Sequence, residues 1–145
     1  MRLALGAQLH LQHGREIGFA PVQLTEQAAL DSVLGPLARA SAPSVLHWHS
    51  DAVELPRGAT LFASTPRTPV QAFRLGSALG TQFHPEADAA LMEAWLATPE
   101  MVRGLPTEQS DALRADARLH LPRLQAPALE GFAAFATAVR QRRGE

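Results

Sequence analysis

The first 86 residues alternate between short apolar runs and breaks rich in proline, glycine or polar residues. Five such runs occupy residues 17–25, 44–56, 56–65, 69–76 and 77–83. Short apolar or alternating runs bounded by Pro and Gly are typical of strands. One helix is predicted among them at 25–35, where Thr25 can cap the first turn and Gly35 can end the helix.

Helical periodicity replaces this pattern after Glu86. Residues 87–97 place their large apolar side chains on one face, and Thr107 begins a second helix with a sequence that resembles a capping box. A third helix is predicted from apolar residues at helical spacing, which are Leu129, Phe132, Ala133, Ala136 and Val139. We expect these stripes to face the core. Strands followed by about three helices predict an α/β or α+β fold.

Composition limits the classes of function. The chain has 145 residues, 46% hydrophobic and 19% charged, which fits one globular domain. A net charge of −1 gives no reason to expect a nucleic-acid or anionic-membrane partner. The apolar runs are too short to cross a membrane, and we expect a cytoplasmic location. The absence of cysteine excludes disulfides, thiolate metal sites and a cysteine nucleophile.

The clearest candidate chemistry lies at the end of the last predicted strand. His84 and Glu86 are two residues apart, so both can project from the same side of an extended chain. Pro85 favours the extended backbone at His84. The carboxylate can orient the imidazole, as in the base and acid of a nucleophile–His–acid device. From spacing alone, an ordinary strand-end pair is the alternative.

A second histidine-rich stretch raises the question of a metal. His47, His49 and Asp51 have the His-x-His-x-Asp spacing found in some zinc sites. The further His and acidic ligands that such a hydrolase needs do not follow at familiar spacing. We therefore expect no metal and no cofactor here.

Four stretches in the observed order resemble the class I glutamine amidotransferases, especially the small GMP-synthase-like members. They are LALGAQL (3–9), REIGFAPVQLT (15–25), the segment 46–76 that begins LHWHSD, and GTQFHPE (80–86). The resemblance covers about residues 1–100. It implies a partial flavodoxin-like α/β sheet in 1–100, followed by a helical tail in 101–145 packed on the same domain.

The resemblance also implies roles for individual residues. In this family a cysteine attacks the side-chain amide of glutamine, a histidine acts as base and then acid, and ammonia passes to a synthase partner. His84 would be the base and Glu86 its orienting acid. Gln8 would contact the substrate, and Leu5 would lend its backbone N–H to the oxyanion hole.

The same resemblance implies that the backbone of Ser50 and Asp51 binds the amino-acid end of glutamine. The nucleophile position, however, aligns with Ala4, whose methyl group cannot attack a carbonyl. Ser50 and Ser64 are the nearest chemical substitutes, but neither lies in an elbow. We therefore expect a pseudoenzyme, inactive as this chain.

Other interpretations remain open. The same scaffold could be a non-catalytic binding or interaction module, or the product of a truncated or decaying gene. The family's N-terminal part has no counterpart before the elbow-like stretch, which predicts an open sheet edge. We expect such a chain to self-associate or to depend on a synthase-like partner.

Overall fold

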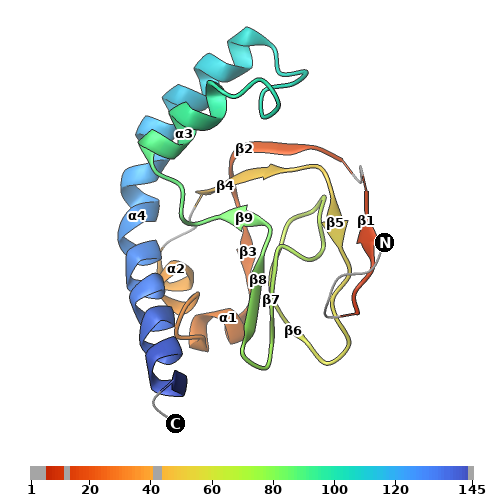
Figure 1. The fold of residues 1–145 in the computed structure, drawn as a ribbon, viewed down its shortest axis with the longest axis vertical. Coiled ribbons are helices and arrows are strands. Elements are labelled where there is room, and N and C mark those ends of the chain that lie inside the picture. Colours follow the sequence, from red (N-terminus) through yellow and green to blue (C-terminus); the bar gives the residue numbers. More distant parts are fainter. Residues whose placement is uncertain (1–5, 12–13, 41–43, 144–145) are drawn as a thin grey trace.

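A computed structural model describes residues 6–11, 14–40 and 44–143. Its strands are β1 (Leu9–His10), β2 (Glu16–Pro21), β3 (Gln23–Leu24), β4 (Ser44–His49), β5 (Ala52–Val53), β6 (Thr60–Ser64), β7 (Ala72–Leu75), β8 (Ala78–Thr81) and β9 (Phe83–His84). Its helices are α1 (Glu26–Leu30), α2 (Gly35–Arg39), α3 (Ala89–Leu96) and α4 (Thr107–Arg143). Strands followed by a helical tail confirm the predicted α/β class (Figure 1).

The strands form three small sheets. Their orders are β1-β5, β2-β4-β9 and β3-β6-β7-β8, and every pairing among the described strands is antiparallel. Successive strands pass from one sheet to the next: β2 leads into β3 after Val22, and β4 leads into β5 after a turn at Ser50 and Asp51. The sheets are therefore joined through the chain itself.

The strand expected at 77–83 is divided at Gln82. The backbone N–H of Gln82 donates to the carbonyl of Gln71 at 2.7 Å, and its side-chain amide donates to the carbonyl of Val70 at 3.2 Å. These bonds hold Gln82 against the segment that precedes β7. The chain then leaves β8 and pairs as β9 with β4, where His84 lies opposite Leu46.

The helix predicted at 25–35 is shorter in the structure: α1 ends at Leu30, and a second short helix, α2, begins at Gly35. Thr25 caps α1 as expected, because its hydroxyl accepts the N–H of Ala28 at 3.2 Å. Gly35 does not end this helix but begins α2. The reason is Asp31, whose extended backbone ends α1 and whose carboxylate accepts the N–H groups of the two residues before Gly35, Val33 and Leu34.

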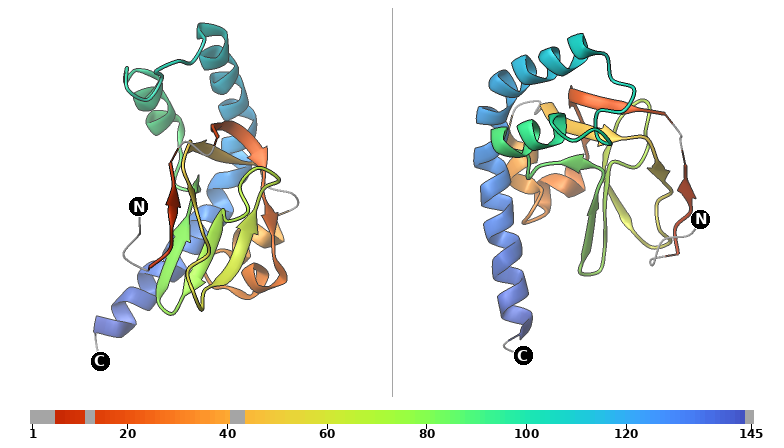
Figure 2. Two further views of the ribbon diagram at one scale, coloured as in Figure 1. Left: turned by 90° about the vertical axis from the view of Figure 1, so that its right-hand side faces the viewer. Right: turned by 45° about the horizontal axis from the view of Figure 1, so that its top comes forward.

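The helices predicted from Thr107 and from residue 129 onward are one continuous helix, α4. Pro122 and Pro127 lie inside it. Proline removes one backbone hydrogen bond and bends a helix, and α4 bends along its course (Figure 2). An uninterrupted buried stripe runs through the first proline, formed by Leu113, Ala117, Leu121, Leu124 and Ala128. Packing of this stripe offsets the loss at the prolines.

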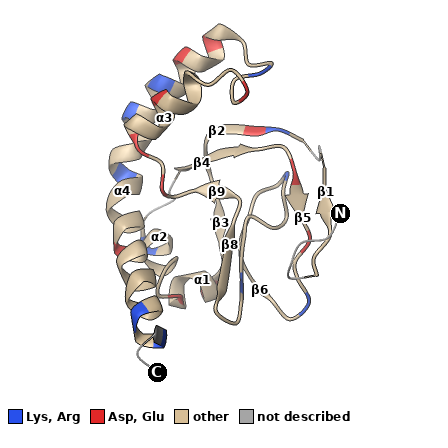
Figure 3. Ribbon diagram, in the orientation of Figure 1, with Lys and Arg blue, Asp and Glu red and all other residues tan. Residues whose placement is uncertain are grey.

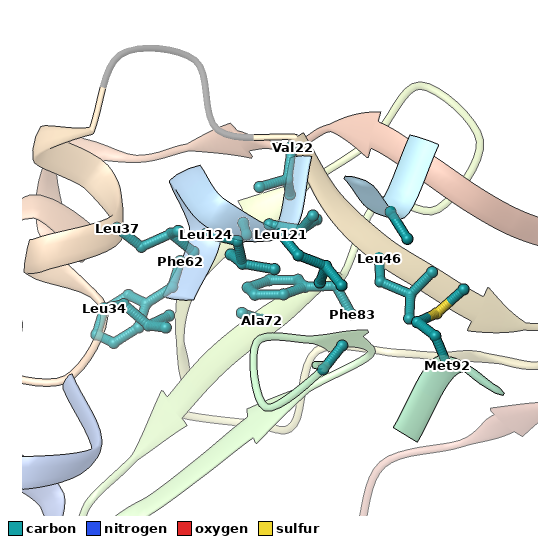
Figure 4. Packing of buried hydrophobic residues seen from close by; sticks show 14 of the residues in the cluster. Val22, Leu34, Leu37, Leu46, Phe62, Ala72, Phe83, Met92, Leu121 and Leu124 are labelled. Carbon is teal, nitrogen blue, oxygen red and sulfur yellow. The ribbon is translucent and has the colours of Figure 1, made fainter. Parts of the chain in front are cut away.

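The core lies between α4, the sheets and the shorter helices (Figure 4). Phe83 is 1% exposed and lies between the α4 leucines and Ala72, while Met92 of α3 contacts the same cluster near Leu46. Burying large apolar side chains contributes about 1.5–3 kcal/mol each. No described helix is both long and apolar enough to cross a bilayer.

Charged side chains on α4 pair with its neighbours at the surface. Acidic and basic positions are interspersed along the helix (Figure 3). Arg114 contacts Glu93 of α3 at 3.1 Å, and Glu130 contacts Arg39 of α2 at 2.9 Å. Exposed pairs of this kind contribute about 0–1 kcal/mol each, so burial of the apolar stripe stabilises α4 more than these pairs do.

The C-terminal half of α4 corrects one expectation. Its apolar side chains at the predicted positions are substantially exposed, with Leu129 at 66%, Phe132 at 36% and Val139 at 36%. Phe132 and Phe135 line a pocket together with Val33 of the α1–α2 turn and Leu79 of β8, and this pocket leaves them partly open to solvent. The stripe predicted as core is therefore only partly covered.

One prediction concerns Asp31, which is a buried link between α1, α2 and β7. Arg74 Nε donates to its Oδ2 at 2.6 Å. Burial alone would raise the pKa of Asp31, but the hydrogen bonds from Arg74 and the two backbone N–H groups outweigh it, so the pKa is lowered. Asp31→Ala should lower the free energy of unfolding by about 2 kcal/mol at pH 7, measured by urea denaturation.

The pH dependence of this loss has a definite sign. A lowered carboxyl pKa contributes stability that is present above the ordinary value, near 3.9, and is lost as pH falls through the folded-state pKa. The gap between wild type and Asp31→Ala should therefore shrink below about pH 4. Glu100→Ala, at an exposed carboxylate, serves as the control. An unchanged gap at pH 3 would contradict the role given to the charged form.

Candidate functional site

The structure brings His84 and Glu86 together as the spacing predicts. His84 Nδ1 lies 2.7 Å from Glu86 Oε1, and the two side chains are 26% and 48% exposed. The hydrogen bond from His84 lowers the pKa of Glu86, more than burial raises it. An ionised carboxylate only accepts, so His84 Nδ1 carries the hydrogen and Nε2 is left as the basic nitrogen. This is the arrangement of an oriented general base.

Two tryptophans support the His84 ring, one directly and one through the other. The rings of His84 and Trp95 meet edge to face, with centroids 4.8 Å apart. Trp95 of α3 makes a similar contact with Trp48 of β4 at 5.2 Å. Edge-to-face contacts favour one ring orientation. The sequence pattern places Trp95 only on a helix face, because nothing in the spacing relates it to His84.

Ser50 and Asp51 follow directly after the far end of β4. Leu46 pairs with His84, and Ser50 follows four residues later, about 13 Å along a strand that rises ~3.3 Å per residue. The carbonyl of Ser50 accepts the N–H of Gly14 at 3.2 Å. The carbonyl of Gln8 accepts the N–H of Glu54, just after β5.

The structure thus brings Gln8 beside the strand that follows Ser50 and Asp51. Ala4 and Leu5 lie outside the described residues. The glutamine-binding roles of Leu5, Gln8, Ser50 and Asp51 stay predictions.

A buried polar network that the sequence did not reveal surrounds Glu16. Its Oε2 accepts the Thr68 hydroxyl at 2.6 Å and the Gln71 amide at 2.8 Å, and its Oε1 accepts the Thr65 hydroxyl at 2.9 Å. His49 Nε2 lies 3.4 Å from Glu16 Oε2. The network joins β2 and β4 to the loop between β6 and β7.

The network favours a charged carboxylate beside neutral imidazoles. Burial alone would raise the pKa of Glu16, but the hydrogen bonds from Thr68 and Thr65 and the nearby histidines lower it overall. Burial lowers the pKa of His47 and of His49, more than the attraction of Glu16 raises them. A protonated His84 would disfavour charging of both rings, which relates this network to the His84 site.

One prediction tests the geometry at His84. Glu86→Ala removes the acceptor that fixes the neutral ring as the Nδ1–H form, so the ring should shift toward the Nε2–H form. Long-range proton–nitrogen NMR spectra of the His84 ring report this directly. Glu54→Ala, which removes the carboxylate 2.9 Å from His10 Nε2, is the matched control and should leave the His84 signals unchanged. Identical His84 tautomers in both variants would count against the orienting role.

Comparison with known proteins gives one kind of match. No family model and no curated protein matches the sequence. Among solved structures, a glutamine amido transferase from Methylobacillus flagellatus has a TM-score of 0.71 at 22% identity, over 92% of this chain and 57% of that one. A glutamine amidotransferase from Thermotoga maritima has a TM-score of 0.59 at 27% identity, over 90% and 53%.

A third structure, of a putative GMP synthase subunit from Thermoplasma acidophilum, has a TM-score of 0.58 at 20% identity, over 97% of this chain and 53% of that one. The chain therefore spans a little over half the length of the solved structures that it matches. The fold is that of the glutamine amidotransferases, and the resemblance to the class I family that the four motifs predicted is confirmed.

Proposed function

We propose that this chain is a GMP-synthase-like glutamine amidotransferase relative that keeps the acid–base pair and lacks glutaminase activity. The observation that carries the proposal is the 2.7 Å contact of His84 Nδ1 with Glu86 Oε1 at the end of β9. A base in this arrangement activates a nucleophile. Glutamine is the substrate class of the ancestral reaction, since two of the similar structures are glutamine amidotransferases.

Ala4 accounts for the proposed inactivity. Amide hydrolysis by this route needs a nucleophile, a base and donors to the developing oxyanion. A methyl group offers no lone pair, and loss of a nucleophile costs on the order of 10⁶-fold in turnover. The chain is then a pseudoenzyme that either still binds glutamine or serves as an interaction module.

The activity prediction uses Ala4→Cys. The unmodified chain should release no ammonia from glutamine above the uncatalysed rate. Ala4→Cys, mixed with the part of the Methylobacillus flagellatus protein that this chain does not match, should recover ammonia release, because it supplies the thiol nucleophile that this reaction requires. The double variant Ala4→Cys/His84→Ala should lose this gain.

Calorimetry with glutamine separates the two roles of the unmodified chain. Binding supports a retained glutamine site, and no binding supports an interaction module. Enzymatic ammonia release by the unmodified chain would overturn the assignment of the nucleophile to position 4, and Ser50 would be tested next.

The exposed apolar stripe on α4 supports a further part of the proposal, that the chain self-associates or binds a synthase-like partner. Leu129, Phe132, Phe135 and Val139 recur at helical spacing and are 36–66% exposed. Burying this stripe in an interface would contribute about 25 cal/mol of binding free energy per Å² of apolar surface removed from water. Sedimentation of the full chain should show dimers or larger species that Leu129→Gln/Phe135→Gln reduces. A wild-type monomer at high concentration would reject self-association.

A further inference from the structure

Strand register gathers three metal-binding side chains on one face of the β2–β4 pair. Glu16 lies directly opposite His49, and His47 precedes His49 by two residues, which places it on the same side of the strand. One ligand atom from each residue lies within 4.8 Å of the others. The acid in this group is Glu16, whereas the His-x-His-x-Asp spacing had drawn attention to Asp51.

The separation of two of these ligand atoms already suits zinc. Ligands about 2.1 Å from a tetrahedral Zn²⁺ are about 3.4 Å from each other. His49 Nε2 and Glu16 Oε2 are 3.4 Å apart. The widest pair in the set, at up to 4.8 Å, would have to close by up to about 1.4 Å, which rotation of a side chain provides.

His47 supplies the second observation that points to a ligand. His47 is 2% exposed, and neither of its ring nitrogens has a hydrogen-bond partner. The backbone of Ala20 lies near the ring and raises the pKa of His47 slightly against the larger effect of burial. Buried polar atoms are nearly always paired, so an unpaired buried imidazole calls for an explanation. A bound cation would be coordinated by the lone pair of one His47 ring nitrogen.

Gln71 offers a fourth ligand. It is fully buried, its Oε1 has no partner, and its Nε2 lies 3.3 Å from His49 Nε2. Flipping the side-chain amide of Gln71 exchanges the positions of Nε2 and Oε1. The oxygen then points toward the space between His49 and Glu16. The hydroxyls of Thr65 and Thr68 would keep their bonds to Glu16 and orient its carboxylate, as outer partners of metal ligands do.

We propose that Glu16, His47 and His49 bind one divalent cation of the zinc type, with the Gln71 carbonyl oxygen as fourth ligand. The proposal does not depend on the proposed function. The donor set of two imidazoles and two oxygens suits Zn²⁺ better than Mg²⁺ or Ca²⁺, which take oxygen ligands. Four protein ligands in a closed, buried site make its role structural: the cation would tie β2 and β4 to the β6–β7 loop.

The test is a titration of the full chain, stripped with a chelator, with ZnCl₂ at pH 7 by calorimetry. One equivalent should bind. Glu16→Gln, His47→Gln and His49→Gln should each weaken binding by more than about 100-fold, since replacing outer partners alone costs 10–100-fold. His10→Gln, at the exposed histidine of β1, is the matched control and should leave binding unchanged.

NMR of the wild-type histidine ring nitrogens keeps the test decisive where a cluster variant does not fold. Zinc should shift the ring signals of His47 and His49 and leave those of His10 and His120 in place. Absence of binding would overturn the proposal. Binding that survives the three cluster variants, or that disappears with His10→Gln, would assign the zinc to the surface and overturn it equally.

Discussion

The pairing of β4 with strands on both sides sets the position of the candidate chemistry. On one side Glu16 of β2 lies opposite His49, and on the other side His84 of β9 lies opposite Leu46. Alternation along β4 directs His47 and His49 to one face, and Leu46 and Trp48 to the other. Trp48 then reaches Trp95, which contacts the His84 ring. A shift of the β4 pairing register by one residue would exchange its two faces and would separate Glu16 from His49 and Trp48 from Trp95.

This register depends on α4, which covers the sheets and touches β2, β4, α2 and α3. The approach is close where α4 passes the turn between α1 and α2: a Cβ on Gly131 would lie 2.2 Å from the carbonyl oxygen of Val33. Glycine is therefore the residue that fits, despite its cost in a helix of about 1 kcal/mol relative to alanine. Burial of the adjacent α4 stripe compensates for this residue and for the two prolines.

Local signals predicted much of this fold. Alternation and Pro or Gly breaks located most strands, Thr25 located a helix start, and the two-residue spacing predicted the contact of His84 with Glu86. Properties that depend on distant residues were missed. The role of Glu16 requires the β2–β4 register, and helix continuity through Pro122 requires the packing of Leu121 and Leu124 against the core. Neither is a property of a short window of sequence.

The two groups of ionisable residues differ in exposure, and exposure decides what each can do. His84 and Glu86 have side chains 26% and 48% exposed, whereas those of Glu16 and His49 are only 15% and 11% exposed and join the strands to the β6–β7 loop. Within the described part of the chain, the hydrogen-bond and ring partners of His84 and Glu16 come from β4, α3, the β6–β7 segment and Glu86. The same central strand, β4, therefore supports an exposed imidazole–carboxylate pair on its β9 side and a buried polar network on its β2 side.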